Sequence, residues 1–501
     1  MLLPDLSDTI AALATPPGLG AIAVLRLSGP RALIIADGVF CGKRLENQAS
    51  HTAHFGRIED EQGRALDEVL VTLFRAPKSY TGEDLVEISV HGSPYIQQEV
   101  LQLLLRRGAR LAQPGEFTLR AFLNGKMDLS QAEAVADLVA SESEAAHSVA
   151  LRQLRGGFKN EIARLREELI HFASLVELEL DFSEEDVEFA DRRQLKGLVQ
   201  NIQGYIRALL QSFTLGNALK TGVATVIAGR PNAGKSTLLN ALLNEERAIV
   251  SDIAGTTRDT IEEVLNIRGV QFRLIDTAGI REAQDQIEAL GVQRTMEKIQ
   301  QAAILVYLWD VTAMTLAEVH GDLANLGPKL PTEVRDTRSP EGEGSRIAAK
   351  MKILVVCNKM DQNPYFNPEW LIDPAAPGVY PYLQSDPPAQ NRIGLTQDQV
   401  ITLSAKNGMN IAYLKEKLFE LAIGEDVPRE STVVTNARHY DALQRADQAL
   451  GDVLTGLDSG VTGDFIAMDI RRALNFLGEI TGEIGVEDLL GAIFSRFCIG
   501  K

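Results

Sequence analysis

The stretch Gly229-Arg230-Pro231-Asn232-Ala233-Gly234-Lys235-Ser236 follows the pattern G-x-x-x-x-G-K-[ST], in which backbone N–H groups curl around phosphates. The apolar run 223–228 before it predicts a β-strand, and residues 237–243 after it predict a helix whose N-terminus favours anions. We expect Lys235 to contact the terminal phosphates and the Ser236 hydroxyl to ligate Mg²⁺. The pattern therefore predicts a phosphate-binding loop in a parallel α/β domain.

Three further motifs follow in order, each after an apolar run that predicts a strand: Asp276 to Gly279, Asn358 to Asp361 and Ser404 to Lys406. We expect Asp276 to hold Mg²⁺ through water and the Gly279 N–H to meet the γ-phosphate. The Asp361 carboxylate can accept paired hydrogen bonds from guanine that adenine cannot supply. Motifs at the strand ends of a doubly wound sheet form one site, so the sequence predicts GTP binding and hydrolysis.

The motifs define the expected site residues. Those expected to bind GTP are Asn232, Ala233, Gly234, Lys235, Ser236, Thr237, Asp276, Thr277, Ala278, Gly279, Asn358, Lys359, Asp361, Ser404, Ala405 and Lys406. Lys235 is also expected to be catalytic. Ile280 cannot hydrogen-bond the attacking water as a glutamine does there in many small GTPases, so another group must do so. A GTPase-like protein without activity is the alternative, which the complete set of motifs disfavours.

Composition bounds the class of protein. The chain has 501 residues, of which 45% are hydrophobic and 24% charged, and its formal net charge is −18. This length predicts several domains, and the acidity argues against a broad polyanion-binding surface, although a local basic patch for RNA is compatible with it. Three scattered cysteines, Cys41, Cys357 and Cys498, exclude a disulfide framework. The N-terminus has no leader pattern and the longest fully apolar run, 302–309, is too short for a bilayer, so we expect a cytoplasmic protein without a membrane segment.

The texture of the sequence predicts a multidomain α/β protein. Residues 1–125 mix strand-like and helix-like segments and predict an α+β domain. Residues 126–220 and 430–501 repeat apolar residues at three- and four-residue spacing, which is typical of amphipathic helices. We expect one α-helical domain interrupted by a doubly wound α/β GTPase domain at 221–429. Two separate helical domains are the alternative.

Local signals add detail to these domains. Ser130 and Glu133 fit a capping box at the start of a helix. Two proline-rich stretches, 328–345 and 363–391, are predicted to be surface loops. Cys357 precedes the Asn358 motif in an apolar run and is expected in the core.

Several stretches outside the nucleotide motifs closely resemble one family, the tRNA-modification GTPases of bacteria and organelles (MnmE or TrmE). They are Asp8-Thr9-Ile10-Ala11-Ala12, Tyr80-Thr81-Gly82-Glu83-Asp84, Pro114-Gly115-Glu116-Phe117-Thr118, Asn124-Gly125-Lys126-Met127-Asp128, Gly255-Thr256-Thr257-Arg258-Asp259 and Phe497-Cys498-Ile499-Gly500-Lys501. The resemblance runs nearly end to end, and only the two proline-rich stretches depart from it.

The resemblance implies a homodimer that forms through the N-terminal domain 1–125, and a K⁺-dependent GTPase that is stimulated when its two nucleotide domains meet. With an FAD-containing partner protein, in a heterotetramer, such proteins add an aminomethyl-type group (carboxymethylaminomethyl) to carbon five of the wobble uridine of certain tRNAs. The one-carbon unit comes from a tetrahydrofolate derivative, in its 5-formyl or methylene form, which the N-terminal domain binds.

The resemblance also assigns roles by position. K⁺ ligands would be Asn232, Ser251, Ile253 and Thr256, and Thr257 would ligate Mg²⁺ beside Ser236. Ser251, Thr256 and Thr257 thereby join the GTP-binding residues. Glu288 would be the catalytic residue that positions the attacking water, although its residue type alone favours an ordinary solvated carboxylate.

Folate-binding positions implied by the resemblance are Arg26, Glu87, Lys126 and Lys501. A carboxylate such as Glu87 can accept paired hydrogen bonds from the pterin ring of a folate, and cationic side chains suit the folate's glutamate tail. Surface charges in ion pairs are the alternative for each position.

A regulatory GTPase switch of ribosome assembly is the rival function. The nucleotide motifs fit both functions equally, whereas the N-terminal stretches and the Cys498-to-Lys501 tail favour tRNA modification.

Overall fold

The computed structural model describes residues 7–181, 192–244, 262–276, 302–326, 334–335, 346–347, 351–372, 395–423, 433–459 and 461–484, and residues 490, 493, 494, 497 and 500. The chain divides into two compact units, which are described separately. One contains Met1–Ala140, Ala150–Gln203 and Arg445–Lys501, and the other contains Ser141–Val149 and Gly204–Gln444. The domain boundaries given above stay predictions.

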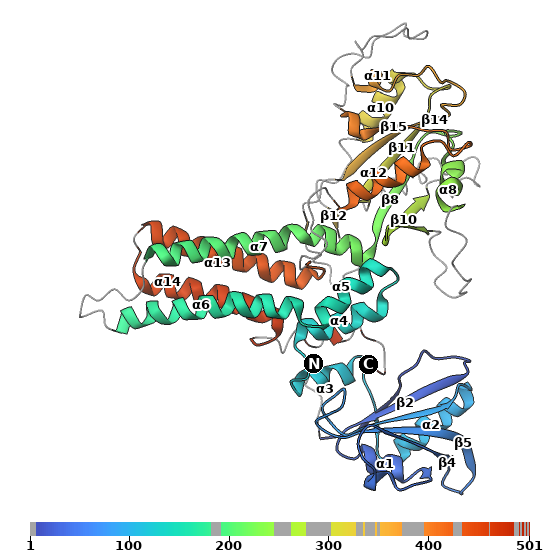
Figure 1. Cartoon of the computed structure of the whole chain (residues 1–501), viewed down its shortest axis with the longest axis vertical. Helices are drawn as coiled ribbons and strands as arrows, with labels where there is room; N and C mark the ends of the chain where they lie inside the picture. The colour runs from blue at the N-terminus through green and yellow to red at the C-terminus, as the bar shows by residue number, and fades with distance from the viewer. Residues whose placement is uncertain are drawn as a thin grey trace. The chain divides into compact units, whose positions relative to one another are not determined.

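The N-terminal part of the first unit is an α+β domain on one mixed sheet (Figure 1). Its described strands lie in the order β3-β4-β5-β6-β2-β1-β7, and they pair antiparallel except for the parallel pair β1–β7. The strands are β1 (Ile10–Leu13), β2 (Ile22–Ser28), β3 (Phe40–Cys41), β4 (Thr52–Glu59), β5 (Ala65–Phe74), β6 (Leu85–His91) and β7 (Arg110–Leu111).

Helices cover one face of this sheet. These are α1 (Ala32–Asp37) and α2 (Pro94–Arg106), and the short 3-10 helix η1 (Leu45–Asn47) lies between β3 and β4 in sequence. In β5, Val69, Val71 and Leu73 are buried in the core that α1 and α2 share with the sheet, and they alternate with residues on the other face. The α+β class expected for this region is therefore confirmed.

The rest of the first unit is helical. The helices that contribute to it are α3 (Glu116–Leu123), α4 (Leu129–Ala140), α5 (Glu144–Leu154), α6 (Gly157–Asp181), α7 (Arg192–Thr221), α13 (Ala437–Ser459) and α14 (Gly463–Thr481). Helices α6 and α14 lie side by side, and Gln203 of α7 donates from Nε2 to the Asp447 carbonyl of α13 at 2.9 Å (Figure 1). Helices from both sides of the nucleotide-binding domain thus pack together, which confirms a single interrupted helical domain.

The predicted cap of α4 is wrong by two residues. Asp128, not Ser130, accepts from the Gln131 N–H at 2.8 Å, and the Gln131 side chain accepts from the Asp128 N–H at 3.1 Å. Asp caps as well as Ser does, so this reciprocal pair competes successfully for the helix start. Glu133 is instead buried within the helix.

The second unit contains the nucleotide-binding domain. Its main sheet has the order β15-β14-β11-β8-β10-β9, with parallel neighbours except for β9, which pairs antiparallel with β10. The strands are β8 (Val223–Ala228), β9 (Glu262–Ile267), β10 (Val270–Asp276), β11 (Ile304–Asp310), β14 (Lys352–Asn358) and β15 (Val400–Thr402). The other elements are α8 (Lys235–Asn244), α10 (Leu316–Leu326), β12 (Val334–Arg335), β13 (Arg346–Ile347), α11 (Glu369–Ile372), η6 (Gln397–Gln399) and α12 (Ile411–Ile423).

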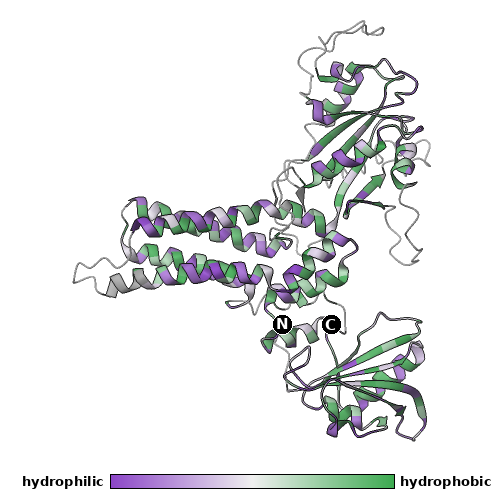
Figure 2. Ribbon diagram, in the orientation of Figure 1, coloured by the Kyte–Doolittle hydropathy of each residue, from purple (hydrophilic) through white to green (hydrophobic). Residues whose placement is uncertain are grey.

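Burial explains this architecture. Every residue of β8 and β11 is buried, as expected for central parallel strands covered on both faces. Figure 2 shows hydrophobic residues concentrated along the strands of both sheets. The doubly wound fold predicted from the motifs is therefore confirmed.

One predicted surface loop begins in the core. Within 363–391, described as far as residue 372, Phe366, Trp370 and Leu371 are buried against Trp309 and its neighbours. Its proline content predicted an exposed loop, but these apolar side chains bind its first part to the sheet. Residues 328–345 lie outside the described residues except for β12.

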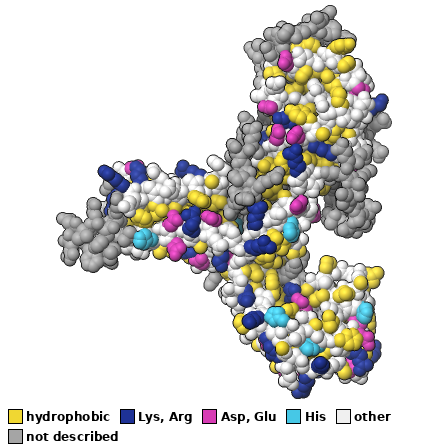
Figure 3. Space-filling view, in the orientation of Figure 1, with side chains coloured by type: hydrophobic (Ala, Val, Ile, Leu, Met, Phe, Trp, Pro, Cys, Tyr) yellow, Lys and Arg dark blue, Asp and Glu magenta, His cyan; other side chains and the backbone are white. Residues whose placement is uncertain are grey.

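The surface agrees with the mixed charge of the sequence. On the face that Figure 3 shows, basic and acidic side chains are interspersed over the helices. Among the described helices, none has the length and apolar character needed to cross a bilayer.

Candidate functional site

The phosphate loop connects β8 to α8 as the sequence predicts. Gly229 and Gly234 have φ of 154° and 99°. A Cβ added at Gly229 would lie 2.1 Å from the Leu308 carbonyl oxygen, and one added at Gly234 would lie 2.4 Å from the Asn358 side chain. Only glycine fits these close approaches. Lys235 donates from Nζ to the carbonyls of Gly229, at 2.6 Å, and Arg230, at 3.0 Å. Its ammonium therefore lies at the loop that is predicted to surround phosphates.

Asn358 joins the phosphate loop to the predicted base pocket. Its side chain donates to the Ala233 carbonyl at 2.8 Å and accepts from the Ala405 N–H at 3.0 Å, and the residue is 2% exposed. The Ser404 hydroxyl donates to the Asp361 carboxylate at 2.7 Å, which leaves Asp361 held at the surface. Three of the predicted motifs thus meet, although more than a hundred residues of sequence separate the phosphate loop from the Asn358 motif.

Arg230 anchors the phosphate loop to α10. Its guanidinium binds Asp322 through two hydrogen bonds, of 2.8 and 3.0 Å, and binds Glu318 at 2.7 Å. The hydroxyl of buried Tyr307, on β11, donates to Asp322 at 2.6 Å. Burial and the neighbouring Asp322 carboxylate raise the pKa of Tyr307, so its phenol stays a donor. Sequence motifs give no sign of this anchor, because α10 contains none of them.

Asp310 is a further acidic group at the site that the motifs do not include. It is the last residue of β11, and its carboxylate binds the ammonium of Lys359 at 2.5 Å. The signal that was available is its place, directly after the apolar run 302–309, at the edge of the sheet where ligands bind.

The remaining nucleotide-site predictions differ in what the structure describes. Asp276 ends β10, next to Ile227 of β8, but its side chain is not among the described ones. Ser236 and Thr237 are exposed at the start of α8, and Lys406 is exposed after Ala405. The predictions that lie outside the described residues are those for Ser251, Ile253, Thr256, Thr257, Thr277, Ala278, Gly279 and Glu288.

A second candidate site lies on the sheet of the N-terminal domain. Arg26 of β2 and Glu87 of β6 are cross-strand partners, and Nε and Nη2 of Arg26 donate to Glu87 Oε1 at 2.9 and 2.8 Å. The Arg26 guanidinium carbon lies 5.5 Å from the ring centre of Tyr80 and 5.7 Å from that of Phe117. It also donates to the Gly500 carbonyl at 3.3 Å. The structure thus brings two predicted folate-site residues and the penultimate residue together.

The other two predicted folate positions are less informative. Lys126 donates from Nζ to the Pro77 carbonyl at 3.0 Å. Lys501 lies outside the described residues, as does Cys498.

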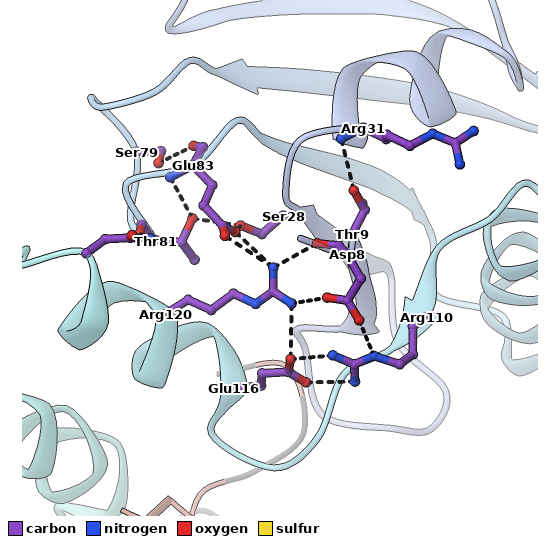
Figure 4. A network of polar contacts seen from close by, with 11 residues as sticks. Asp8, Thr9, Ser28, Arg31, Ser79, Thr81, Glu83, Arg110, Glu116 and Arg120 are labelled. Carbon is purple, nitrogen blue, oxygen red and sulfur yellow. Dashed lines mark hydrogen bonds and ion pairs between the residues drawn. The ribbon is translucent and has the colours of Figure 1, made fainter. Parts of the chain in front are cut away.

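A buried charged network lies beside the Arg26 site, and its three carboxylates, but not its two arginines, come from the family-like stretches (Figure 4). Arg120 of α3, with a side chain that is 0% exposed, binds the carboxylates of Asp8, Glu83 and Glu116. Arg110 binds Asp8 at 2.5 Å and Glu116 at 2.6 Å. We call these five residues the Arg120 network.

Helix α3 connects the Arg120 network to the Arg26 site. Phe117 packs near Arg26, the hydroxyls of Thr118 and Tyr80 share a hydrogen bond of 2.8 Å, and Arg120 enters the network. Thr118 and Arg120 of one helix therefore hold the loop that contains Tyr80 and Glu83.

Comparison with known proteins identifies relatives over the whole length. A model described as the MnmE helical domain matches residues 129–498, and one described as the N-terminus of the GTP-binding protein TrmE matches residues 9–126. The tRNA modification GTPase MnmE of Cytophaga hutchinsonii is 54% identical over 495 residues, which cover 99% of this chain and 98% of that protein. The protein of the same name from Christiangramia forsetii is 51% identical over 504 residues, 99% of this chain and 100% of that protein.

Among solved structures, a GTP-binding protein of Sulfolobus solfataricus in complex with GDP is 17% identical and covers 56% of this chain and 78% of that chain. Its TM-score is 0.27. The sequence relatives, by contrast, confirm the resemblance seen in the short stretches. With identities of about half over nearly every residue, the chain belongs to the family of tRNA modification GTPases named MnmE.

Proposed function

We propose that this chain hydrolyses GTP and acts in tRNA modification. The observation that best supports GTP binding is the pair of bonds from Asn358 to Ala233 and Ala405, which joins phosphate loop and base pocket in one site. Asp361 is then available to accept the guanine ring N–H and amino group. Membership of the family supports the tRNA half of the proposal, and the cytoplasm is the proposed location.

Base selection tests the nucleotide half. Asp361→Asn should weaken GTP binding and admit xanthine nucleotides, because the amide donates where the carboxylate accepts. Binding of GTP, XTP and ATP to both proteins by calorimetry is the measurement. Equal affinity of the unmodified protein for ATP and GTP would contradict the proposal.

Catalysis in this proposal uses metal ions and Glu288. Mg²⁺ would be held by Ser236 and Thr257, and K⁺ by Asn232, Ser251, Ile253 and Thr256. Of these residues, Asn232 and Ser236 are described, and both are exposed oxygen-bearing side chains at the loop, as hard cations require. Glu288 would position the attacking water, a role that Ile280 cannot take.

Cation dependence is a direct test of that catalytic proposal. GTPase activity should rise strongly when NaCl is replaced by KCl at constant ionic strength, and Asn232→Ala should abolish the rise. Glu288→Ala should lower kcat with little change in GTP affinity, since it acts on the water. Equal rates in the two salts would overturn the role of K⁺.

The modification reaction in this proposal needs partners. The chain would form a homodimer and join an FAD-containing protein in a heterotetramer that modifies carbon five of the wobble uridine. Modification of wobble uridines in tRNA from cells lacking the gene is the decisive measurement. Full modification, with defective ribosomal particles instead, would favour the assembly switch.

A tetrahydrofolate derivative would supply the one-carbon unit at Arg26, Glu87, Lys126 and Lys501. The residues fit such a group. Both Arg26 bonds use Oε1 of Glu87, so neither of them occupies Oε2, and the rings of Tyr80 and Phe117 beside Arg26 suit a flat ligand. Glu87→Ala should weaken 5-formyltetrahydrofolate binding about tenfold, because pterin donors lose a charged acceptor. Calorimetry with the unmodified protein as control decides it.

A further inference from the structure

Asp310 ends β11, at the carboxyl-terminal ends of the parallel strands, where the nucleotide motifs also lie. In the parallel pair of β11 and β14, Asp310 is the register partner of Asn358, and the Val311 N–H donates to the Asn358 carbonyl at 3.2 Å. Asp310 is 6% exposed, and it belongs to none of the four motifs. A nearly buried carboxylate requires a specific partner, and Lys359 is that partner.

Both oxygens of this carboxylate are fixed. Oδ2 accepts from Lys359 Nζ at 2.5 Å, and Oδ1 accepts from the Thr312 N–H at 2.9 Å and from the Thr312 hydroxyl at 2.6 Å. Burial would raise the pKa of Asp310, but these hydrogen bonds outweigh burial and lower it, so the group is charged at neutral pH. The two bonds from Thr312 therefore orient the carboxylate independently of its bond to Lys359.

Lys359 has a backbone conformation that its residue type disfavours. Its φ is 65°, in the left-handed region, and it lies between residues that are held in place. Asn358 on one side binds the phosphate loop, and the Met360 N–H on the other donates to the Leu403 carbonyl at 3.2 Å. With its backbone fixed and its ammonium bound to Asp310, the four-carbon stem of Lys359 has a defined course.

We propose that Asp310 is a positioning residue of the guanine site, which sets nucleotide affinity by holding the Lys359 side chain in place. Lys359 then presents its apolar stem to the nucleotide, and Asp310 acts through it without touching the ligand. This inference rests on the proposed GTP-binding function and adds a residue to it.

A double-mutant cycle tests whether Asp310 acts through Lys359. Asp310→Asn should raise the Kd for GDP about tenfold, since a charge-assisted bond is lost, while kcat at saturating GTP stays within about twofold. Lys359→Met keeps the stem and removes the charge. In a Lys359→Met background, Asp310→Asn should change the Kd by less than about twofold, because the interaction is already absent.

A purely structural role of Asp310, at the turn containing Thr312, would make the two effects multiply, and that result would overturn the inference. Asp398→Asn is the matched control, because it removes the charge of another aspartate paired with a lysine, Lys417, in the same domain, where Asp398 is 88% exposed. The control should bind GDP as the unmodified protein does. An equal loss of affinity in Asp398→Asn would also overturn the inference.

Thr312→Val provides a second test of the inference if circular dichroism shows that Asp310→Asn does not fold. It removes one donor to Asp310 and should raise the Kd for GDP roughly threefold, but only when Lys359 is present. The same rise in the Lys359→Met background would overturn the inference. If the unmodified protein does not bind GDP, the proposed function fails as well, whereas GDP binding that Asp310→Asn leaves unchanged overturns this inference alone.

Discussion

Arg120 and Arg230 are each held by more than one carboxylate, but they differ in burial. The Arg120 side chain is 0% exposed, and that of Arg230 is 41% exposed. Removing a buried ionic partner leaves charges that water cannot solvate, whereas exposed ion pairs contribute little to stability. The comparison suggests that the first arrangement stabilises its domain and the second orients the phosphate loop.

Arg120→Gln should have the largest effect on stability. It leaves the carboxylates of Asp8, Glu83 and Glu116 without their central cation, and breaking such a buried arrangement typically costs about 3–5 kcal/mol. Urea unfolding, monitored at the transition of the N-terminal domain, measures this loss of stability. The affinity for GDP should be retained, because the substitution lies outside the nucleotide-binding domain.

Arg64→Gln is the matched control for Arg120→Gln. Arg64 also pairs with a carboxylate, Asp60, but its side chain is 63% exposed. Its substitution should leave the unfolding transition almost unchanged. A similar destabilisation by both substitutions would show that burial does not distinguish the two kinds of pair.

Acid should weaken the Arg120 network and so lower the stability of the N-terminal domain. Burial would raise the pKa of Asp8 and of Glu116, but hydrogen bonds from Arg110 and the other bonds outweigh it, so both pKa values are lowered. These carboxyls bind fewer protons when folded, so their stabilisation is complete above the unfolded pKa of about 4 and is lost as the pH falls below it. Urea unfolding between about pH 3 and pH 7 measures this. Arg120→Gln should flatten the profile, and an unchanged slope would contradict the assignment.

Arg230→Gln should affect nucleotide binding more than stability. An exposed ion pair contributes about 1 kcal/mol or less, so the unfolding transition should shift little. The phosphate loop loses its tether to Asp322 and Glu318, and we expect the KM for GTP to rise roughly fivefold. Arg230→Lys should be intermediate, because it keeps the charge but not the paired bonds. An unchanged KM together with a large loss of stability would reverse the comparison.

The sequence predicted the nucleotide site better than either arginine arrangement. The phosphate loop and the Asn358 motif are short continuous patterns, and their strands are apolar runs that a single window can detect. The partners of Arg120 are 112 residues away at Asp8 and 37 away at Glu83, so no local pattern predicts them. The fold class could thus be inferred, but not these long-range charge contacts.

Errors of the sequence interpretation have local causes. Two overlapping patterns fitted the start of α4, and only the structure shows that the one containing Asp128 is used. Proline content concealed the apolar residues Phe366 and Trp370 in a predicted loop. Arg26 and Glu87 were brought to notice by family resemblance alone, and their register across β2 and β6 was not predictable from either strand.

Tyr307→Phe should have the smallest effect and gives the finest test of how the phosphate loop is held. The change removes only the hydroxyl that donates to Asp322 at 2.6 Å, in a side chain that is 3% exposed, and leaves the ring packed. The loss of one hydrogen bond should cost about 1 kcal/mol of stability. Because Asp322 then orients Arg230 less firmly, the KM for GTP should rise by no more than about twofold. In an Arg230→Gln background this rise should disappear, since Asp322 has no guanidinium left to orient. A rise of the same size in both backgrounds would mean that Tyr307 acts on the nucleotide site through β11 and not through the Arg230 anchor.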